Sequence, residues 1–135
     1  ADCTVEDLKF DAEIRNMDGE RISSMSTEQG AKLWAVIHNE CEKAIEFETL
    51  HNCLVESWSI NLMGGDVSTG EYPCSGDSSS RGIGPTGKLE QEVIALYDLA
   101  VGTYEMSIVY GHVDSTGTLS EAKVTIGVVN PSPTH

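Results

Sequence analysis

Histidines and cysteines are the side chains of this sequence whose spacing comes closest to a chemical site. The stretches "HNEC" and "HNC" place His38 close to Cys41 and His51 close to Cys53. Two imidazoles and two thiolates suit zinc, provided that the two stretches lie at the ends of neighbouring strands. The alternative is that the histidines lie on the surface beside structural cysteines. We adopt this second interpretation and predict no metal ligands, with a metal carrier kept as an alternative function.

The four cysteines are better explained as a disulfide framework. They are irregularly spaced and form no C-x-x-C pair, which argues against a zinc knuckle or a thioredoxin-like redox site. An even number of distant cysteines is typical of exported proteins, so we expect a secreted, periplasmic or cell-surface protein. We predict that Cys53 pairs with Cys74 and that Cys3 pairs with Cys41, although four cysteines allow three connectivities.

Motifs for catalysis and cofactor binding are missing from the sequence. It contains no G-x-S-x-G nucleophile elbow, and the glycines of residues 82–87 are not followed by the G-K-[ST] of a phosphate loop. Asp66, Glu71, Asp77 and Asp98 could offer oxygens to calcium, but no D-x-D-x-D-G pattern supports such a site. We therefore predict no catalytic residues, no cofactor and no enzymatic activity.

The charge balance narrows the possible partners. Eight basic residues stand against 22 acidic ones, which gives a net charge of −14. Nucleic acids and anionic membrane surfaces both favour clustered Lys and Arg, so we expect neither as a partner. No apolar run approaches the roughly 18–20 residues of a membrane span, so we expect no membrane insertion. We therefore expect the protein to bind another protein or to associate with itself.

The elements that position these residues are predicted to be strands. Seven segments alternate apolar and polar residues, which is typical of half-buried antiparallel strands. These segments are residues 8–14, 32–39, 44–49, 54–62, 88–97, 103–110 and 121–129. Seven short strands without intervening helices predict an all-β fold, an antiparallel immunoglobulin-like β-sandwich, with a Greek-key barrel as the alternative. We expect a single domain over residues 1–130 and a proline-containing tail over residues 131–135.

Two places in this pattern are candidates for contact with a partner. Residues 63–87 hold seven Gly and five Ser, and so long a loop in a compact domain is usually functional or disordered. Tyr72 and Arg81 lie in this loop, and a proteinase inhibitor that presents it is an alternative function. Trp34 lies opposite the face of Leu33, and is therefore either a second core contact or an exposed anchor for a partner.

The stretch "DLAVGTYEMSIVY" resembles the tyrosine corner of immunoglobulin-like domains, in which a turn and a Gly lead into a strand that opens with Tyr. This resemblance implies that the hydroxyl of Tyr104 bonds back to nearby backbone. Tyr110 is expected to matter less to stability if its hydroxyl reaches solvent. A copper-protein strand also begins with Gly-x-Tyr, but Ser107 and Ile108 stand where the thiolate ligand would be, so we expect no copper.

Upstream, "STEQGAKLWAVIHNECEKAIEFET" resembles the second and third strands of bacterial immunoglobulin-like modules. The shared layout is a polar turn with Gly, an alternating strand that ends in Asn, a short polar bend and a second apolar strand. The bacterial intracellular proteinase inhibitor family has this layout, as do many secreted adhesion and carrier modules. The resemblance implies a non-catalytic module that acts through protein–protein interaction, as an adhesion or surface module or as a filament subunit.

Overall fold

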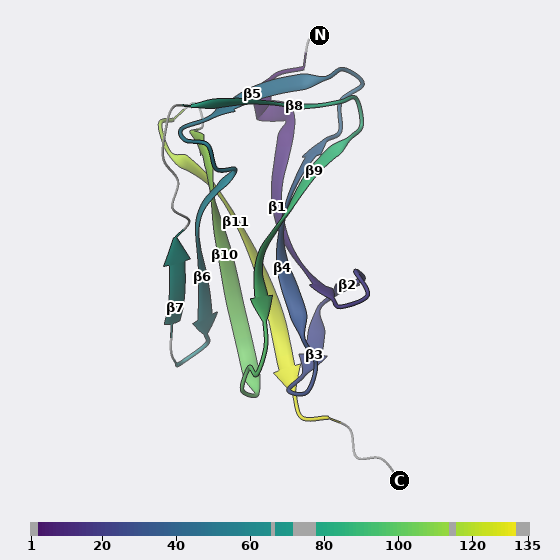
Figure 1. Ribbon diagram of the computed structural model, residues 1–135, viewed down its shortest axis with the longest axis vertical. Helices are drawn as coiled ribbons and strands as arrows, with labels where there is room; N and C mark the ends of the chain where they lie inside the picture. The colour runs from purple at the N-terminus through teal and green to yellow at the C-terminus, as the bar shows by residue number, and fades with distance from the viewer. Residues whose placement is uncertain (1–2, 66, 72–77, 114–115, 132–135) are drawn as a thin grey trace.

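The computed structural model describes residues 3–65, 67–71, 78–113 and 116–131. These residues form a β-sandwich with a short 3-10 helix, η1, before the first strand (Figure 1). The elements are η1 (Val5–Asp7), β1 (Leu8–Asn16), β2 (Arg21–Ile22), β3 (Ser24–Ser26), β4 (Ala31–Asn39), β5 (Ile45–Thr49), β6 (Val55–Leu62), β7 (Val67–Glu71), β8 (Ser79–Ile83), β9 (Lys88–Leu96), β10 (Gly102–Val113) and β11 (Leu119–Val129).

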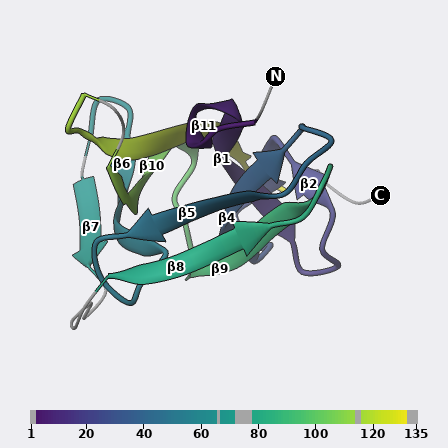
Figure 2. The same cartoon turned by 90° about the horizontal axis from the view of Figure 1, so that it is seen from above.

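Two sheets face each other, and a third, two-stranded sheet crosses one end. The first sheet has the order β2-β1-β4-β9 and the second has the order β3-β11-β10-β6-β7. The pair β5-β8 spans the upper end of the sandwich, as Figure 1 shows from the side and Figure 2 from above. All pairings are antiparallel except that of β3 with β11. The predicted all-β sandwich is therefore confirmed.

Each of the seven predicted segments contains a strand, and four further short strands complete the sheets. The turn at Asp18 and Gly19 joins β1 to β2, where Asn16 Oδ1 accepts hydrogen bonds from the backbone of Asp18 and Glu20, both at 2.9 Å. Residues 63–87 also contribute two edge strands, β7 against β6 and β8 against β5. Gly and Ser have low strand propensity, so the composition of this segment conceals the strands.

Alternating side chains of both sheets build the core. Leu33, Ala35 and Ile37 of β4 are fully buried, as their period of two predicts. From the opposite sheet, Tyr110 of β10 is also fully buried, and its hydroxyl donates across the sandwich to the backbone oxygen of Asp11 in β1. The hydroxyl of Tyr110 thus bonds inside the protein rather than to solvent. Burial raises the pKa of Tyr110, so this hydroxyl keeps its proton at ordinary pH.

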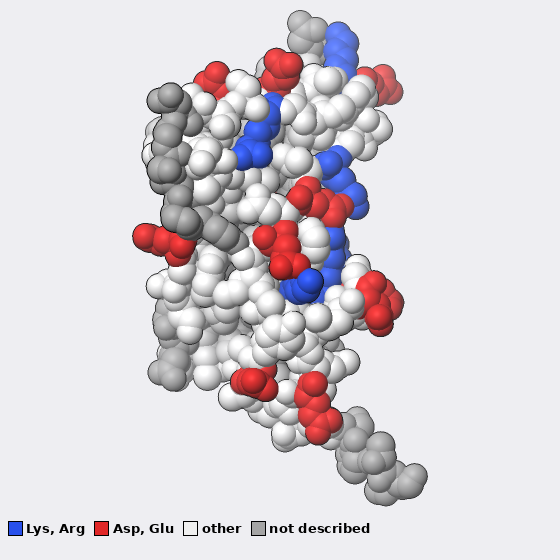
Figure 3. Space-filling model, viewed as in Figure 1, with Lys and Arg blue, Asp and Glu red and all other residues white. Residues whose placement is uncertain are grey.

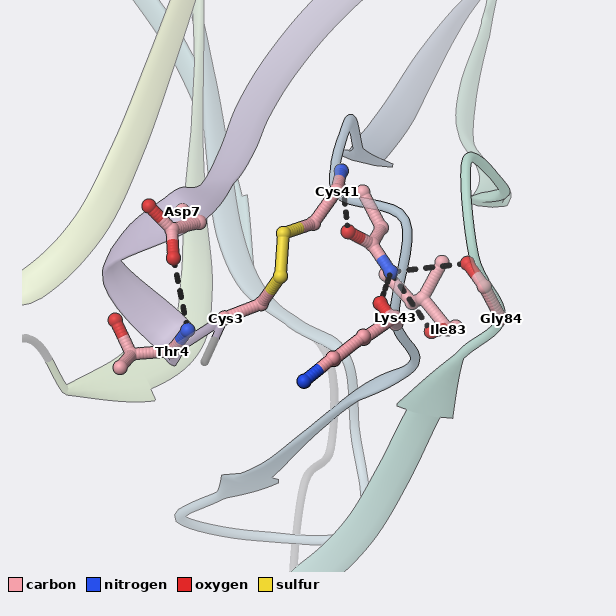
Figure 4. Close-up of a disulfide and its surroundings, with 8 residues drawn as sticks. Cys3, Thr4, Asp7, Cys41, Lys43, Ile83 and Gly84 are labelled. Carbon is pink, nitrogen blue, oxygen red and sulfur yellow. Dashed lines mark hydrogen bonds between the residues drawn. A yellow bond between two sulfur atoms is a disulfide. The ribbon is translucent and has the colours of Figure 1, made fainter. Parts of the chain in front are cut away.

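A disulfide and a buried amide fix the corner where β4 turns into β5 (Figure 4). Cys3 and Cys41 are joined, with their Cα atoms 6.4 Å apart, which agrees with the predicted pairing. They meet because Leu8 of β1 pairs with Asn39 of β4, so the chain before β1 lies beside the chain after β4. The buried Asn39 donates from Nδ2 to three backbone oxygens and accepts from the N–H of Cys41 at 2.9 Å.

Candidate functional site

The lower end of the sandwich, as seen in Figure 1, is where several strands of both sheets finish or begin. In the first sheet the end of β1 pairs with the start of β4, and the start of β4 pairs with the end of β9. In the second sheet the start of β10 meets the ends of β6 and β11. The connection between β9 and β10 joins the two sheets at this end. Turns and loops from separate parts of the chain are therefore brought together.

Large apolar side chains are exposed on these turns and loops and at the end of β11. We name this set the apolar tip, and its members are Met17, Met63, Tyr97, Val101 and Val129. Among the described residues, only Leu50 and Val113 are other large hydrophobic residues with comparable exposure, and both lie toward the opposite end. Tyr97 is 56% exposed and Met63 is 62% exposed. Exposure of several apolar groups to water is unfavourable, so their presence at one end of the molecule indicates a surface that binds a partner.

Glycines let the side chains of the apolar tip approach the backbone. A Cβ atom on Gly30 would lie 2.6 Å from Tyr97 Cε1 and 3.6 Å from Met17 Sδ, so both side chains lie over this glycine. On the second sheet, the backbone N–H of Met63 donates to the oxygen of Thr103 at 2.9 Å. The β6–β7 turn is thus tied to the first residues of β10, next to Val101.

Tyr104 holds the loop that carries two members of the apolar tip. Its ring is 5% exposed, and its hydroxyl donates to the backbone oxygen of Ala100 at 2.7 Å. This is the backbone contact that the tyrosine-corner resemblance implies. The bond spans four residues and closes the loop between Tyr97 and Val101 onto the start of β10. The corner therefore also fixes the position of exposed apolar groups.

More acidic than basic residues lie near the apolar tip, where the exposed Arg21 directly follows Glu20. Asp18, Glu20, Glu28 and Asp98 lie in its turns and loops and are all exposed. On the face that Figure 3 shows, the lowest part of the molecule carries acidic side chains but no basic ones. An apolar patch with an acidic rim is complementary to a patch that combines apolar and basic side chains.

Trp34 is neither in the core nor fully exposed. It lies half-buried on the outer face of the first sheet, with Arg15 Cζ 4.5 Å from the centroid of its ring. Arg15 Nη1 lies 2.6 Å from Glu90 Oε2, and Glu13 contacts the same guanidinium. Burial alone would lower the pKa of Arg15, but these carboxylates raise it, while Arg15 followed by Lys88 lowers the pKa of Glu90. The contact of Trp34 with a partner stays a prediction.

Arg81, the described candidate residue of the Gly- and Ser-rich segment, is not part of the apolar tip. Arg81 lies in β8 opposite Phe47, and its Nη2 donates to the backbone oxygen of Asn52 at 3.0 Å. Its Nε is buried and has no hydrogen-bond partner among the described residues. Tyr72 and Cys74 lie outside the described residues.

The histidine and cysteine residues do not meet as a four-ligand cluster in the described part of the chain. Cys41 is bonded to Cys3, and Cys53 is also disulfide-bonded. His38 Nε2 lies 3.6 Å from a carboxylate oxygen of Asp11, and His51 Nδ1 lies 2.7 Å from Glu56 Oε1. The sulfurs that the zinc hypothesis needs as thiolates are therefore occupied by disulfides. Cys3, Asp7 and Cys41 lie close together, but both sulfurs of this group belong to one disulfide.

Sequence reasoning missed the apolar tip, although a local signal was present. Met17 directly precedes Asp18-Gly19, Met63 precedes two glycines, and Tyr97 precedes Asp98, which has a positive φ of 55°. A large apolar residue next to a turn is often exposed, because turns run over the surface. The local sequence does not show, however, that these turns lie at the same end of the sandwich.

Comparisons with known proteins give no family. No family model and no curated protein matches the sequence. Among solved structures, the CARDB domain of the PF1109 protein of Pyrococcus furiosus, in complex with di-metal ions, is 10% identical with a TM-score of 0.45, over 96% of this chain and 100% of that one. The structural-genomics target SoR45 is 16% identical with a TM-score of 0.47, over 96% and 91%. The C-terminal domain of Wzt is 17% identical with a TM-score of 0.43, over 93% and 75%. These values are too low to carry an argument about function.

Proposed function

We propose that this protein is a non-catalytic β-sandwich that binds a protein partner through the apolar tip. The observation that supports the proposal is that five exposed large apolar side chains lie at one end of the sandwich, four on turns and loops and Val129 at the end of β11. Loops held on a rigid β-scaffold are a common place for recognition. The acidic rim and the net charge of −14 favour a partner that surrounds its own apolar contact with basic residues.

The proposed location is outside the cytoplasm, as a secreted, periplasmic or cell-surface protein. The Cys3–Cys41 disulfide supports this part of the proposal, because disulfides persist mainly in oxidising compartments. No helix among the described residues is long and apolar enough to cross a membrane. Within this proposal the chain acts as an adhesion or surface module, or as a subunit of an assembly.

The proteinase-inhibitor alternative gains less support. An inhibitory side chain has to project into the specificity pocket of the protease. Arg81 instead lies within a strand, is half-buried and donates to the backbone of Asn52. Its geometry is that of a side chain that ties β8 to the segment before β6.

Two double variants, each of which replaces two exposed apolar side chains, test the proposal. Tyr97→Ser with Val101→Ser removes half-exposed groups from the tip, and Leu50→Ser with Val113→Ser removes similar groups from the opposite end. Wild type and both variants serve as immobilised bait for native extracellular proteins. Proteins retained by the wild type and the control, but not by the tip variant, are identified, purified and titrated.

We expect such a partner to bind through a basic surface, with an affinity that falls as salt screens the rim charges. Equal binding of a purified partner to both double variants would contradict the proposal. Sedimentation velocity of the three proteins provides the second test. If the wild type associates with itself and only the tip variant does not, the tip is a contact between copies, and the separate basic partner is wrong.

A further inference from the structure

A hollow of about 710 Å³ opens at the upper end of the sandwich. It lies between η1 and the ends of β10 and β11 that face it, and its apolar lining comes from Val5, Leu8, Phe10 and Val113. Sites for small molecules are typically a few hundred to about 1,000 Å³ in volume and largely apolar. The size and lining of this hollow therefore suit a small organic ligand rather than a single water molecule.

Side-chain contacts fix the aromatic part of this lining. The rings of Phe10 and His112 are stacked, with centroids 5.1 Å apart and planes 14° apart. The edge of Phe47 packs against His112, with the centroids 5.9 Å apart. Nδ1 of His112 lies 2.9 Å from the hydroxyl oxygen of Ser120. A ligand would meet rings already held in place, so binding would require little side-chain ordering.

η1 forms one wall of the hollow, and covalent and hydrogen bonds hold it in place although it contributes little to the core. None of the three residues of η1 is buried. Yet the Cys3–Cys41 disulfide anchors the chain two residues before it, as Figure 4 shows, and Asp7 Oδ2 accepts the backbone N–H of Thr4 at 2.8 Å. The backbone N–H of Asp7 in turn donates to the oxygen of Thr4 at 2.9 Å. Fixing this segment preserves the shape of the hollow beside it.

The charged residues that line the hollow indicate which charge a ligand should carry. Glu6 is the acidic residue among the described lining residues, and no Lys or Arg lies among them. Hydroxyl groups of Thr4, Thr116 and Ser120 add hydrogen-bonding capacity around the apolar surface. We propose that this hollow binds a small organic cation with an aromatic or branched apolar body. The apolar part would lie on the Phe10 side and the cationic group beside Glu6.

Two phenols of similar shape and opposite charge test this proposal directly. Tyramine is the cationic probe and 4-hydroxyphenylpropionate is the anionic one, and each is titrated while backbone amide resonances are followed by NMR. We expect tyramine to shift resonances of Val5, Leu8, His112 and Val113 saturably, with a Kd of about 1 mM for so small a ligand. The anionic probe should bind more weakly.

Three variants connect the binding to this hollow. Val113→Trp, and independently Thr116→Trp, should fill the hollow and abolish tyramine binding, whereas Val129→Trp, at the opposite end, should leave it unchanged. Glu6→Gln should weaken tyramine binding by about twofold to fivefold, as expected for an exposed ion pair. Amide dispersion shows whether each variant is folded.

The double variant Cys3→Ser with Cys41→Ser tests the role of the anchored wall. It should remain folded and bind tyramine more weakly, because η1 loses its covalent anchor. The proposal is overturned if tyramine causes no saturable shifts up to about 10 mM, well above a millimolar Kd. It is also overturned if both probes bind equally, or if folded Val113→Trp and Thr116→Trp proteins bind tyramine as the wild type does. None of these results depends on the apolar tip.

Discussion

Removal of the Tyr104 hydroxyl should have a small and local effect, because the structure limits how much can be lost. Tyr104→Phe keeps the buried ring and deletes only the donor of the 2.7 Å bond to the backbone oxygen of Ala100. A net neutral hydrogen bond contributes about 1 kcal/mol, and a buried acceptor left without a partner adds about 1–3 kcal/mol. Ala100 is exposed, so water can take the place of the lost donor. We therefore expect a loss of about 1 kcal/mol in the free energy of unfolding.

Tyr110 is the matched comparison on the same strand. Its ring is fully buried, and the hydroxyl donates to the backbone oxygen of Asp11, with Val36 as a second acceptor at 3.4 Å. The Tyr110 side chain itself is not exposed, so Tyr110→Phe should destabilise the fold by about 2–3 kcal/mol. We therefore expect Tyr110→Phe to lower the free energy of unfolding more than Tyr104→Phe does. A solvent-exposed Tyr110 hydroxyl would give the opposite order.

Urea denaturation of the wild type and both variants measures this order, under non-reducing conditions so that the disulfides stay intact. Hydrogen exchange of residues 97–101 separates the local effect from the global one. The loop should exchange faster in Tyr104→Phe, because the bond that closes it is missing. Equal stability of the three proteins, or unchanged exchange of this loop in Tyr104→Phe, would refute the corner as a support of the apolar tip.

The remaining predictions concern three other contacts. Asn39→Ala should cost at least about 3 kcal/mol in urea denaturation, because it leaves buried backbone oxygens without donors. Gly70→Val should displace Trp58, whose Cζ2 would lie 2.3 Å from the new Cβ, and a red shift in tryptophan fluorescence would show the displacement. Glu90 has a pKa below its usual value because Arg15 bonds its carboxylate, so its stabilising effect exists above the unfolded-state pKa and is lost as the pH falls through the folded-state pKa. Glu90→Gln should therefore be less stable than the wild type at neutral pH, and thermal unfolding should show the difference closing in acid.

The periodicity of two is sufficient to predict the long strands and the face of β4 that is buried. It works because a strand with one face in the core must alternate, as Leu33, Ala35 and Ile37 do. The Cys3–Cys41 pair is predicted as one of three possible connectivities, and it forms because β1 and β4 are antiparallel neighbours in the folded chain. The short edge strand β8 could not be predicted in this way, because its Ser and Gly residues form no apolar face.

The two candidate sites depend on contacts between residues far apart in the sequence. Phe10 and His112 stack only because β1 and β10, from opposite sheets, approach each other at the upper end. Tyr97 and Met17 meet over Gly30 only because three strands of one sheet end together. Neither spacing nor composition contains this information, so the sites become visible only in the folded chain.

The Cys3–Cys41 disulfide also determines how the molecule would respond to a pulling force. A force applied before Cys3 and after β11 would pass from Cys3 through the sulfur atoms to Cys41 and bypass the chain between them. That segment includes β1 and β4. The sequence separation of 38 between Cys3 and Cys41 corresponds to about 130 Å of extended chain that could not be released. Force would instead act on the strands after Cys41. Reduction of the disulfide would allow the chain between Cys3 and Cys41 to extend under force. The redox state of the surroundings would therefore determine the maximum extension of the protein.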